Sequence, residues 1–139
     1  MKRITVLLAD DHTIVREGLR ALLAMEEDIE VVGEAANGHQ AVAFAHKLVP
    51  DVVVMDLAMP LLNGLDALER IRECIPASTR VLVLSSYTED GYVQKARALG
   101  ASGYLVKQSE SHVLATAIRA VNQGQLYFKP IQPATVQSP

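Results

Sequence analysis

Residues 51–64 read DVVVMDLAMPLLNG, and they carry the clearest indication of the fold class. Val52–Met55 is an apolar run without polar alternation, which is typical of a strand covered on both faces, as in a parallel sheet. Asp56 ends this run, and Pro60 and Gly64 indicate a turn before a helical pattern begins. The stretch therefore predicts a buried parallel strand that brings an acidic residue to the edge of a sheet.

The same kind of pattern repeats along the chain. Apolar or β-branched runs predict strands at Ile4–Ala9, Glu30–Ala35, Val52–Met55, Arg80–Leu84 and Gly103–Val106. Helical periodicity predicts helices at Thr13–Met25, Gly38–Leu48, Gly64–Ile75, from Thr88 to Gly100, and from about Glu110 to Gln123. This alternation predicts one α/β domain built around a parallel sheet with right-handed crossovers.

Some features of individual helices can also be predicted. Asn37 can cap the second helix, with Gln40 in capping-box spacing, and Thr88 can cap the fourth. Gly91 and small neighbours should make the fourth helix the least firmly held. The first helix should carry one apolar stripe, made of Ile14, Val15, Gly18, Leu19, Leu22 and Leu23.

Residues 1–124 are expected to form the domain, and residues 125–139 are expected to be a tail or the start of a linker. The last segment holds three Pro and three Gln and lacks an apolar period. The linker would lead to a domain that is absent from this sequence.

Composition excludes several classes of protein. The formal net charge is −3 and basic residues are not clustered, so direct nucleic-acid binding is not expected. Cys74 is the only cysteine, which argues against a structural zinc site and fits a reducing cytoplasm. The chain has neither a signal-peptide pattern nor an apolar run long enough for a membrane span, so no membrane partner is expected.

Polar side chains occur where the predicted strands end. Asp10 and Asp11 follow the first strand, Asp56 follows the third, Ser85 follows the fourth and Lys107 follows the fifth. The carboxyl ends of parallel strands share one edge, where ligands bind, so these side chains should converge. Neighbouring carboxylates repel one another unless a cation is present, and Mg²⁺ prefers oxygen ligands. With a lysine and a hydroxyl beside it, such a site suits a phosphoryl group.

Each of these residues has a plainer interpretation when it is taken alone. Asp10 and Asp11 could form a turn and a helix N-cap, Ser85 could be a loop hydroxyl, and Lys107 could be a solvated strand end. For Asp56 a functional role is favoured, because a carboxylate at the end of a buried strand is costly unless it is used. Taken together at four strand ends, the residues favour a functional site.

The histidines carry little signal. His12 lies beside the acidic pair and could line the mouth of the cleft, whereas His39, His46 and His112 are expected on helix surfaces. The sequence has no His pair at i, i+4 spacing and no GxGxxG or Walker A motif. Neither a histidine-based metal site nor nucleotide binding is therefore predicted.

As an ordered set, four segments resemble the signature of response-regulator receiver domains. They are LLADDHTIVREGL, DVVVMDLAMPLLNGLDAL, VLVLSSYTED and GASGYLVK, and the resemblance covers residues 3–123. The DDH start and the AIRAVNQGQLYFKP ending are most similar to the NarL/FixJ branch, which usually carries a C-terminal LuxR-type helix-turn-helix. The resemblance implies a receiver truncated before that module. It also implies a flavodoxin-like, doubly wound (βα)5 fold with strand order 2-1-3-4-5.

The resemblance also implies a role for each residue of the acidic cluster. Asp56 matches the phospho-acceptor, and Asp11 matches the acidic residue that binds Mg²⁺ directly. Asp10 matches its partner, which commonly acts through water, and the backbone carbonyl of Ala58 matches the third protein ligand. Lys107 matches the lysine that pairs with the phosphoryl oxygens.

A conformational switch and a set of partners are implied in the same way. Ser85 matches the switch hydroxyl and Tyr104 the switch aromatic, so phosphorylation should draw Ser85 toward the phosphoryl group and let Tyr104 turn inward. The implied donor is a sensor histidine kinase, and homodimer formation on phosphorylation is left open. DNA would be bound only through the absent output domain. The expected role is that of a signalling domain that catalyses only its own phosphorylation and dephosphorylation.

Three other functions compete with this interpretation. A haloacid-dehalogenase-type hydrolase also uses Asp, Mg²⁺ and Lys, but its nucleophile ends the first strand in a DxD arrangement, which Asp10-Asp11-His12 does not fit. A flavodoxin-like binding module would need a phosphate-cradling Ser/Thr/Gly loop after the first strand, and this sequence lacks such a loop. A pseudo-receiver would act only as an interaction domain, and the complete acid–Ser–Lys set argues against it.

Overall fold

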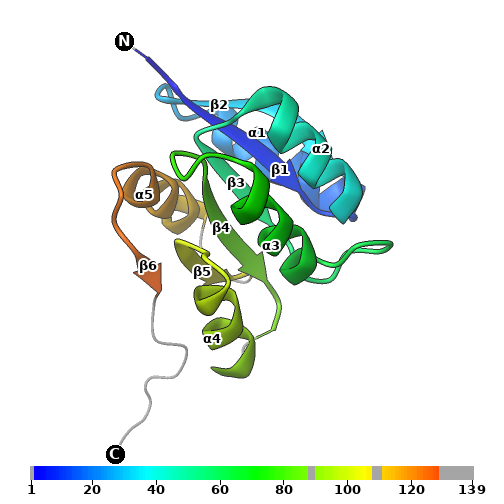
Figure 1. The fold of residues 1–139 in the computed structure, drawn as a ribbon. Helices are drawn as coiled ribbons and strands as arrows, with labels where there is room; N and C mark the ends of the chain where they lie inside the picture. Colours follow the sequence, from blue (N-terminus) through cyan, green and yellow to red (C-terminus); the bar gives the residue numbers. More distant parts are fainter. Residues whose placement is uncertain (1, 88–89, 108–110, 129–139) are drawn as a thin grey trace, which may run out of the picture.

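A computed structural model of the chain describes residues 2–87, 90–107 and 111–128, and strands and helices alternate along them (Figure 1). The strands are β1 (Ile4–Ala9), β2 (Ile29–Ala35), β3 (Val52–Met55), β4 (Arg80–Ser85), β5 (Gly103–Val106) and β6 (Tyr127–Phe128). The helices are α1 (Thr13–Ala24), α2 (Gly38–Leu48), α3 (Gly64–Cys74), α4 (Asp90–Ala98) and α5 (Ser111–Asn122). The predicted alternation is confirmed. The proposed cap Thr88 and the expected helix start near Glu110 lie outside the described residues.

All the strands form a single parallel sheet with the order β2-β1-β3-β4-β5-β6. The predicted order 2-1-3-4-5 is therefore confirmed, with β6 added at one edge. Strand order reverses at β1, which has β2 on one side and β3 on the other. This reversal point is where an open α/β sheet offers its ligand site, at the carboxyl ends of the strands.

Helices cover both faces of the sheet (Figure 1). On one face α2, α3 and α4 pack against alternate strand residues, and their buried side chains include Ala41, Leu68 and Ala96. On the other face α1 and α5 do the same, through Leu23 and Ile118 among others. Each helix in the described part of the chain is too short or too polar to span a lipid bilayer.

The predicted two-sided burial of Val52–Met55 is confirmed. Val53 and Met55 pack into the core under α2, α3 and α4, whereas Val52 and Val54 pack into the core under α1 and α5. Successive side chains of a strand point to opposite faces, so a strand at the centre of a three-layer fold must be apolar at every position. The same rule accounts for the unbroken apolar sequence of β4.

Asn37 caps α2 as predicted. Its side-chain oxygen accepts a hydrogen bond from the Gln40 backbone N–H at 2.9 Å, and the Gln40 side chain accepts one from the Ala36 N–H at 2.8 Å. The first bond satisfies a donor that the first turn of a helix leaves free, and the second holds the residue before the cap. At the C-terminal end of α3, Ile75 is extended, because the residue before a proline disfavours helical geometry.

Only part of the predicted apolar stripe of α1 is buried. Leu23 is buried and Leu19 is half-buried, but Ile14 is 84% exposed, and Val15 and Leu22 are exposed as well. The face of α1 that packs against the domain is therefore not centred on the predicted apolar stripe. It includes Arg16, whose side chain is only 14% exposed. The helix is therefore positioned partly by a polar contact that apolar periodicity does not reveal.

Strand β6 lies within residues 125–139, where the sequence indicated only a tail or linker. Tyr127 pairs with Gly103 and Phe128 with Tyr104, and the Tyr127 N–H donates to the Ser102 carbonyl oxygen at 2.9 Å. Gly103 makes the approach possible, because a Cβ there would lie 2.8 Å from the Tyr127 carbonyl oxygen. A strand of two residues is too short to give a periodic signal in the sequence.

Candidate functional site

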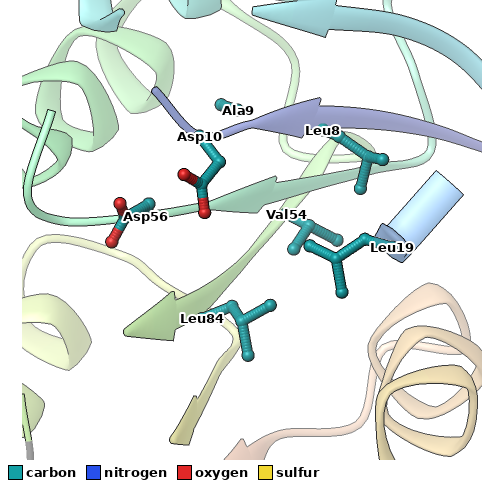
Figure 2. A pocket seen from close by; sticks show the side chains of 7 residues that line it. All are labelled: Leu8, Ala9, Asp10, Leu19, Val54, Asp56 and Leu84. Atoms are coloured by element: carbon teal, nitrogen blue, oxygen red, sulfur yellow. The ribbon is translucent and has the colours of Figure 1, made fainter. Parts of the chain in front are cut away.

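The acidic residues and the lysine that follow the strands converge as predicted. Lys107 follows β5, and its Nζ lies 2.9 Å from Asp10 Oδ2 and 3.3 Å from Asp56 Oδ2. The Asp56 N–H donates to the Ala9 carbonyl at 2.9 Å, and the Lys107 N–H donates to the Ser85 carbonyl at 2.9 Å. The register of the strands therefore determines the positions of the two acidic residues and of the lysine. Figure 2 shows the carboxylates of Asp10 and Asp56 at the ends of β1 and β3.

The acids form a cluster with the donor set of a divalent-cation site. Ligand atoms of Asp10, Asp11, His12 and Asp56 all lie within 4.8 Å of one another. Asp10 and Asp56 are each only 3% exposed, while Asp11 lies nearer the surface. Asp56 Oδ2 and Asp11 Oδ1 are buried oxygens that make no well-aligned hydrogen bond among the described residues. Closely spaced carboxylate oxygens are the ligands that Mg²⁺ prefers.

Burial is the main influence on the Asp56 carboxyl. Together with Asp10 it lines a small pocket whose other walls are Leu8, Ala9, Leu19, Val54 and Leu84 (Figure 2). This burial raises the pKa of Asp56; the Lys107 charge works in the opposite direction, and the Asp10 charge adds to the increase. A cation bound beside Asp56 would favour the ionised form that a nucleophile requires.

Lys107 remains charged in this setting. Its burial alone would lower its pKa, but the hydrogen bond to Asp10 and the charges of Asp56 and Asp10 outweigh that effect and raise the pKa above 10.5. The site thus combines a fixed cation with a cluster of carboxylates. That combination suits a ligand that brings anionic oxygens, because Lys107 can pair with them while the carboxylates hold a metal.

His12 lies at the mouth of the cluster. Its Nδ1 is 3.1 Å from Asp10 Oδ1 and 3.1 Å from Asp11 Oδ1, and its backbone N–H donates to Asp10 Oδ1 at 2.8 Å. His12 itself is the N-cap residue of α1, so the plainer interpretation of the acidic pair as the cap of this helix is wrong. Asp10 Oδ1 accepts the bond that forms the turn, and Asp10 Oδ2 remains in the pocket beside Lys107. The other histidines, His39, His46 and His112, are exposed as expected.

The loop after Asp56 is held close to the site. The Ala58 N–H donates to Asp56 Oδ1 at 3.3 Å, and the Gly64 N–H donates to the Leu57 carbonyl at 2.9 Å. A Cβ on Gly64 would lie 2.2 Å from the Asp56 carbonyl oxygen, so glycine is required where α3 begins. Leu61 adopts a φ of 69°, a left-handed conformation that the sequence did not indicate.

Ser85 and Tyr104 meet through a third residue. The buried Ser85 Oγ accepts a hydrogen bond from the Tyr87 N–H at 3.0 Å, and the Tyr104 hydroxyl donates to the Tyr87 carbonyl at 2.8 Å. The Tyr87 ring stacks on Tyr92 of α4, with centroids 4.5 Å apart. Tyr104 is buried, which is the orientation that we expected of the phosphorylated state.

Arg16 is the residue of this region that sequence reasoning missed. Its Nη1 donates to the Asp10 carbonyl oxygen at 2.6 Å, so α1 contacts the segment that follows β1. The only signal available was a charged residue one turn after the Asp-Asp-His segment. Charged residues on a helix are usually solvated, so that signal is weak.

Comparison with known proteins decides the family. The model of the response regulator receiver domain matches residues 6–119. The chain belongs to the response regulator receiver domain family. The alternatives of a haloacid-dehalogenase-type hydrolase and of a flavodoxin-like binding module are therefore excluded, and the receiver resemblance is confirmed.

The curated relatives that this receiver domain matches are response regulators. Response regulator protein VraR from Staphylococcus aureus is 40% identical over 127 residues, which make up 91% of this chain and 60% of VraR. The receiver therefore spans about 60% of the length of the curated relatives that it matches.

Solved structures agree with this assignment. A LuxR-family two-component response regulator from Aurantimonas sp. SI85-9A1 has a TM-score of 0.87 and 36% identity, over 93% of this receiver and 91% of that chain. The isolated receiver domain of RcsB from Salmonella enterica serovar Typhimurium, in the presence of the phosphomimetic BeF3−, has a TM-score of 0.85 and 26% identity, over 98% of this receiver and 100% of that chain. The chain is thus the receiver domain of a two-component response regulator of the NarL/LuxR type.

Proposed function

We propose that this receiver domain accepts a phosphoryl group on Asp56 from the phosphohistidine of a sensor histidine kinase, in a reaction that requires Mg²⁺. One observation carries the assignment to Asp56. Its Oδ2 is a buried carboxylate oxygen that makes no well-aligned hydrogen bond among the described residues, and its ion-pair partner Lys107 Nζ lies 3.3 Å away. An oxygen held in this way is free to form a new covalent bond.

The acidic residues around Asp56 would hold the metal. Asp11 would hold it directly and Asp10 through water, and Asp56 and the Ala58 backbone carbonyl would be the other protein ligands. When bound, Mg²⁺ neutralises charge on the phosphoryl oxygens. Lys107 neutralises charge on the same group from the other side, because its Nζ already lies between Asp10 and Asp56.

The reaction is a transfer of the phosphoryl group from nitrogen to oxygen. Asp56 Oδ2 attacks phosphorus, the bond from phosphorus to the histidine nitrogen breaks, and the imidazole leaves with the electron pair of that bond. The product is an aspartyl phosphate, a covalent intermediate expected of a carboxylate nucleophile. The domain catalyses only this step and its own dephosphorylation by water.

The phosphoryl group would act on the surface formed by α4, β5 and α5. Ser85 moves toward the new oxygens, and because its Oγ accepts from the Tyr87 N–H, this movement reaches Tyr104 through the Tyr87 carbonyl. A charge change beside an element with two arrangements is the usual basis of such switches.

In the full-length protein, we propose that this surface controls a LuxR-type DNA-binding domain that follows residues 125–139. The relatives that the chain matches are longer than this receiver, which leaves room for such a module. In this proposal the receiver itself does not contact DNA and works in the cytoplasm.

Mapping of the modified residue tests the proposal. The chain is treated with acetyl phosphate and Mg²⁺, and the product is digested and analysed by mass spectrometry. We expect one phosphorylated residue, Asp56, and no labelling of Asp56→Ala. Asp66→Ala is a matched control, because Asp66 is an exposed carboxylate on α3 outside the cluster. Full labelling at another residue would contradict the assignment to Asp56. No labelling of the parent chain would contradict the proposal and favour a pseudo-receiver.

A further inference from the structure

Arg16 connects the acidic cluster to the neighbouring strand β2. Its Nη1 donates to the Asp10 carbonyl oxygen at 2.6 Å, and its Nε donates to Glu34 Oε1 at 2.9 Å. We propose that Arg16 is a positioning residue that fixes the Asp10–Asp11 peptide and thereby sets the affinity of the acidic cluster for Mg²⁺. This inference rests on the function proposed above.

The carbonyl that Arg16 binds belongs to the peptide unit that joins Asp10 to Asp11. A peptide unit is planar, so a hydrogen bond to its oxygen restricts the rotation that determines where the Asp11 Cα lies. The Asp10 N–H is also held, because it donates to the Ala35 carbonyl of β2 at 3.0 Å. The Asp10 backbone is thus connected to β2 in two ways. Its N–H bonds directly to Ala35, and its carbonyl oxygen is linked to Glu34 through the Arg16 side chain.

Arginine suits this position for two reasons. Its planar guanidinium can donate to two acceptors at once, whereas the ammonium of a lysine is a single point charge. Its charge is also balanced, because the hydrogen bond from Arg16, followed by that from Arg20, lowers the pKa of Glu34 and keeps that carboxylate ionised. Arg16 can therefore orient Asp10 without cancelling the negative potential that attracts a cation.

Arg20 provides a matched comparison within the same helix. Its Nη1 donates to Glu34 Oε2 at 2.6 Å, so both arginines share one carboxylate, but its side chain is 60% exposed. Of these two arginines, only Arg16 also donates to Asp10 among the contacts of the described residues. Loss of Arg20 removes an ion pair to Glu34, whereas loss of Arg16 removes an ion pair and the bond to the Asp10 carbonyl.

The experiment measures Mg²⁺ binding in the absence of phosphorylation. MgCl₂ is titrated into the unphosphorylated 139-residue chain, and the dissociation constant is obtained from backbone amide shifts. We expect Arg16→Met to weaken Mg²⁺ binding about tenfold, which is the usual effect of removing a group that orients a metal ligand. We expect Arg20→Met to change it by less than about twofold, since exposed ion pairs contribute little. Arg16→Lys should be intermediate, because it can keep only one of the two contacts.

The outcomes separate this inference from the proposed function. An unchanged affinity in Arg16→Met, or an equal loss in both methionine variants, would overturn the positioning role while Mg²⁺ binding itself stood. A parent chain that bound no Mg²⁺ would contradict the proposed function and this inference with it. If Arg16→Met did not fold, Arg16→Lys would decide. A weaker affinity at parental thermal stability supports the role, and an unchanged affinity overturns it.

Discussion

The Tyr104 hydroxyl donates a hydrogen bond to the Tyr87 carbonyl oxygen at 2.8 Å and so ties β5 to the segment that follows β4. The N–H of the same Tyr87 donates to Ser85 Oγ at 3.0 Å. The backbone of a single residue therefore connects the Ser85 hydroxyl, at the end of β4, with the buried Tyr104. A displacement of Ser85 has a direct route to β5 and to α4, on which the Tyr87 ring stacks through Tyr92.

Replacement of Tyr104 by Phe tests this connection. The ring stays buried, but the Tyr87 carbonyl loses its donor, so we expect a loss of about 1–2 kcal/mol in the free energy of unfolding. Hydrogen exchange at Ser86 and Tyr87 should become faster, as measured by mass spectrometry. Tyr92→Phe is the control, since it keeps the stacked ring and should leave exchange there unchanged. Equal protection in the parent and in Tyr104→Phe would show that the bond does not hold this segment.

The buried charge of Asp56 should cost stability at neutral pH. Burial raises the pKa of Asp56 above its unfolded value of 3.8, so folding favours the protonated form. Below the unfolded pKa the carboxyl is neutral in both states and has no effect. As the pH rises from the unfolded pKa to the folded pKa, the unfolded state ionises first, so the folded state is progressively destabilised, and the effect is complete above the folded pKa. We therefore expect Asp56→Asn to be more stable than the parent at pH 7 by about 0.5–2 kcal/mol, which is a common gain when a destabilising functional residue is replaced.

Urea unfolding without divalent cations, measured at several pH values, checks this expectation. The advantage of Asp56→Asn should shrink as the pH falls and should vanish below about pH 4, where the unfolded carboxyl is protonated too. The exposed Asp66, replaced by Asn, provides the comparison for a carboxylate outside the cluster. A parent that is more stable than Asp56→Asn at pH 7 would mean that the ion pair with Lys107 outweighs the burial of the charge.

Gly64 should be intolerant of any side chain. A Cβ there would meet the Asp56 carbonyl oxygen at 2.2 Å and the Leu57 Cα at 2.6 Å, and neither backbone atom can move without shifting Asp56. We expect Gly64→Ala to lose about 2–4 kcal/mol of stability, in the range of severe steric replacements, and to be phosphorylated more slowly. Denaturant unfolding and acetyl phosphate labelling measure the two effects.

Gly18 supplies the control for this substitution. It lies in α1, and a Cβ added there would have no neighbouring atom within 4 Å. Gly18→Ala should therefore stabilise the protein by about 0.5–1 kcal/mol through helix propensity. A similar loss at both glycines would show that chain flexibility, and not the close approach to Asp56, determines the result.

The site could be predicted from the sequence because strand register alone determines it. Asp10 follows β1, Asp56 follows β3 and Lys107 follows β5, and in a parallel sheet the ends of these strands must lie together. The unbroken apolar run Val52–Met55 was sufficient to indicate that kind of sheet. No knowledge of side-chain contacts was needed for either step.

Features that depend on individual polar contacts or close approaches could not be predicted in this way. Arg16 resembles a solvated helix residue until its bond to the Asp10 carbonyl is seen, and the same bond helps to rotate α1 so that Ile14 stays exposed. Strand β6 depends on the space that Gly103 leaves for Tyr127. Periodicity reports which faces are apolar, and it does not report which polar groups meet.

Mg²⁺ should partly restore the stability that is lost when Lys107 is replaced. Its Nζ lies between Asp10 Oδ2 and Asp56 Oδ2, so Lys107→Met leaves two buried carboxylates without a cation. We expect a loss of about 2–4 kcal/mol in EDTA, because one partner of a buried ion pair has been removed. Added MgCl₂ should restore part of this loss, since a ligand that binds only the folded state stabilises it.

The pH dependence of this loss gives a second test of the same substitution. Although burial opposes it, pairing with Asp10 and Asp56 raises the pKa of Lys107 above the unfolded value of 10.5. A raised lysine pKa contributes stability that is fully present below the unfolded pKa and is lost as pH rises through the folded pKa. The difference between the parent and Lys107→Met, measured by urea unfolding in EDTA, should therefore be constant near neutral pH and decrease in strongly alkaline solution. A variant as stable as the parent in EDTA would show that Lys107 does not offset the repulsion between Asp10 and Asp56.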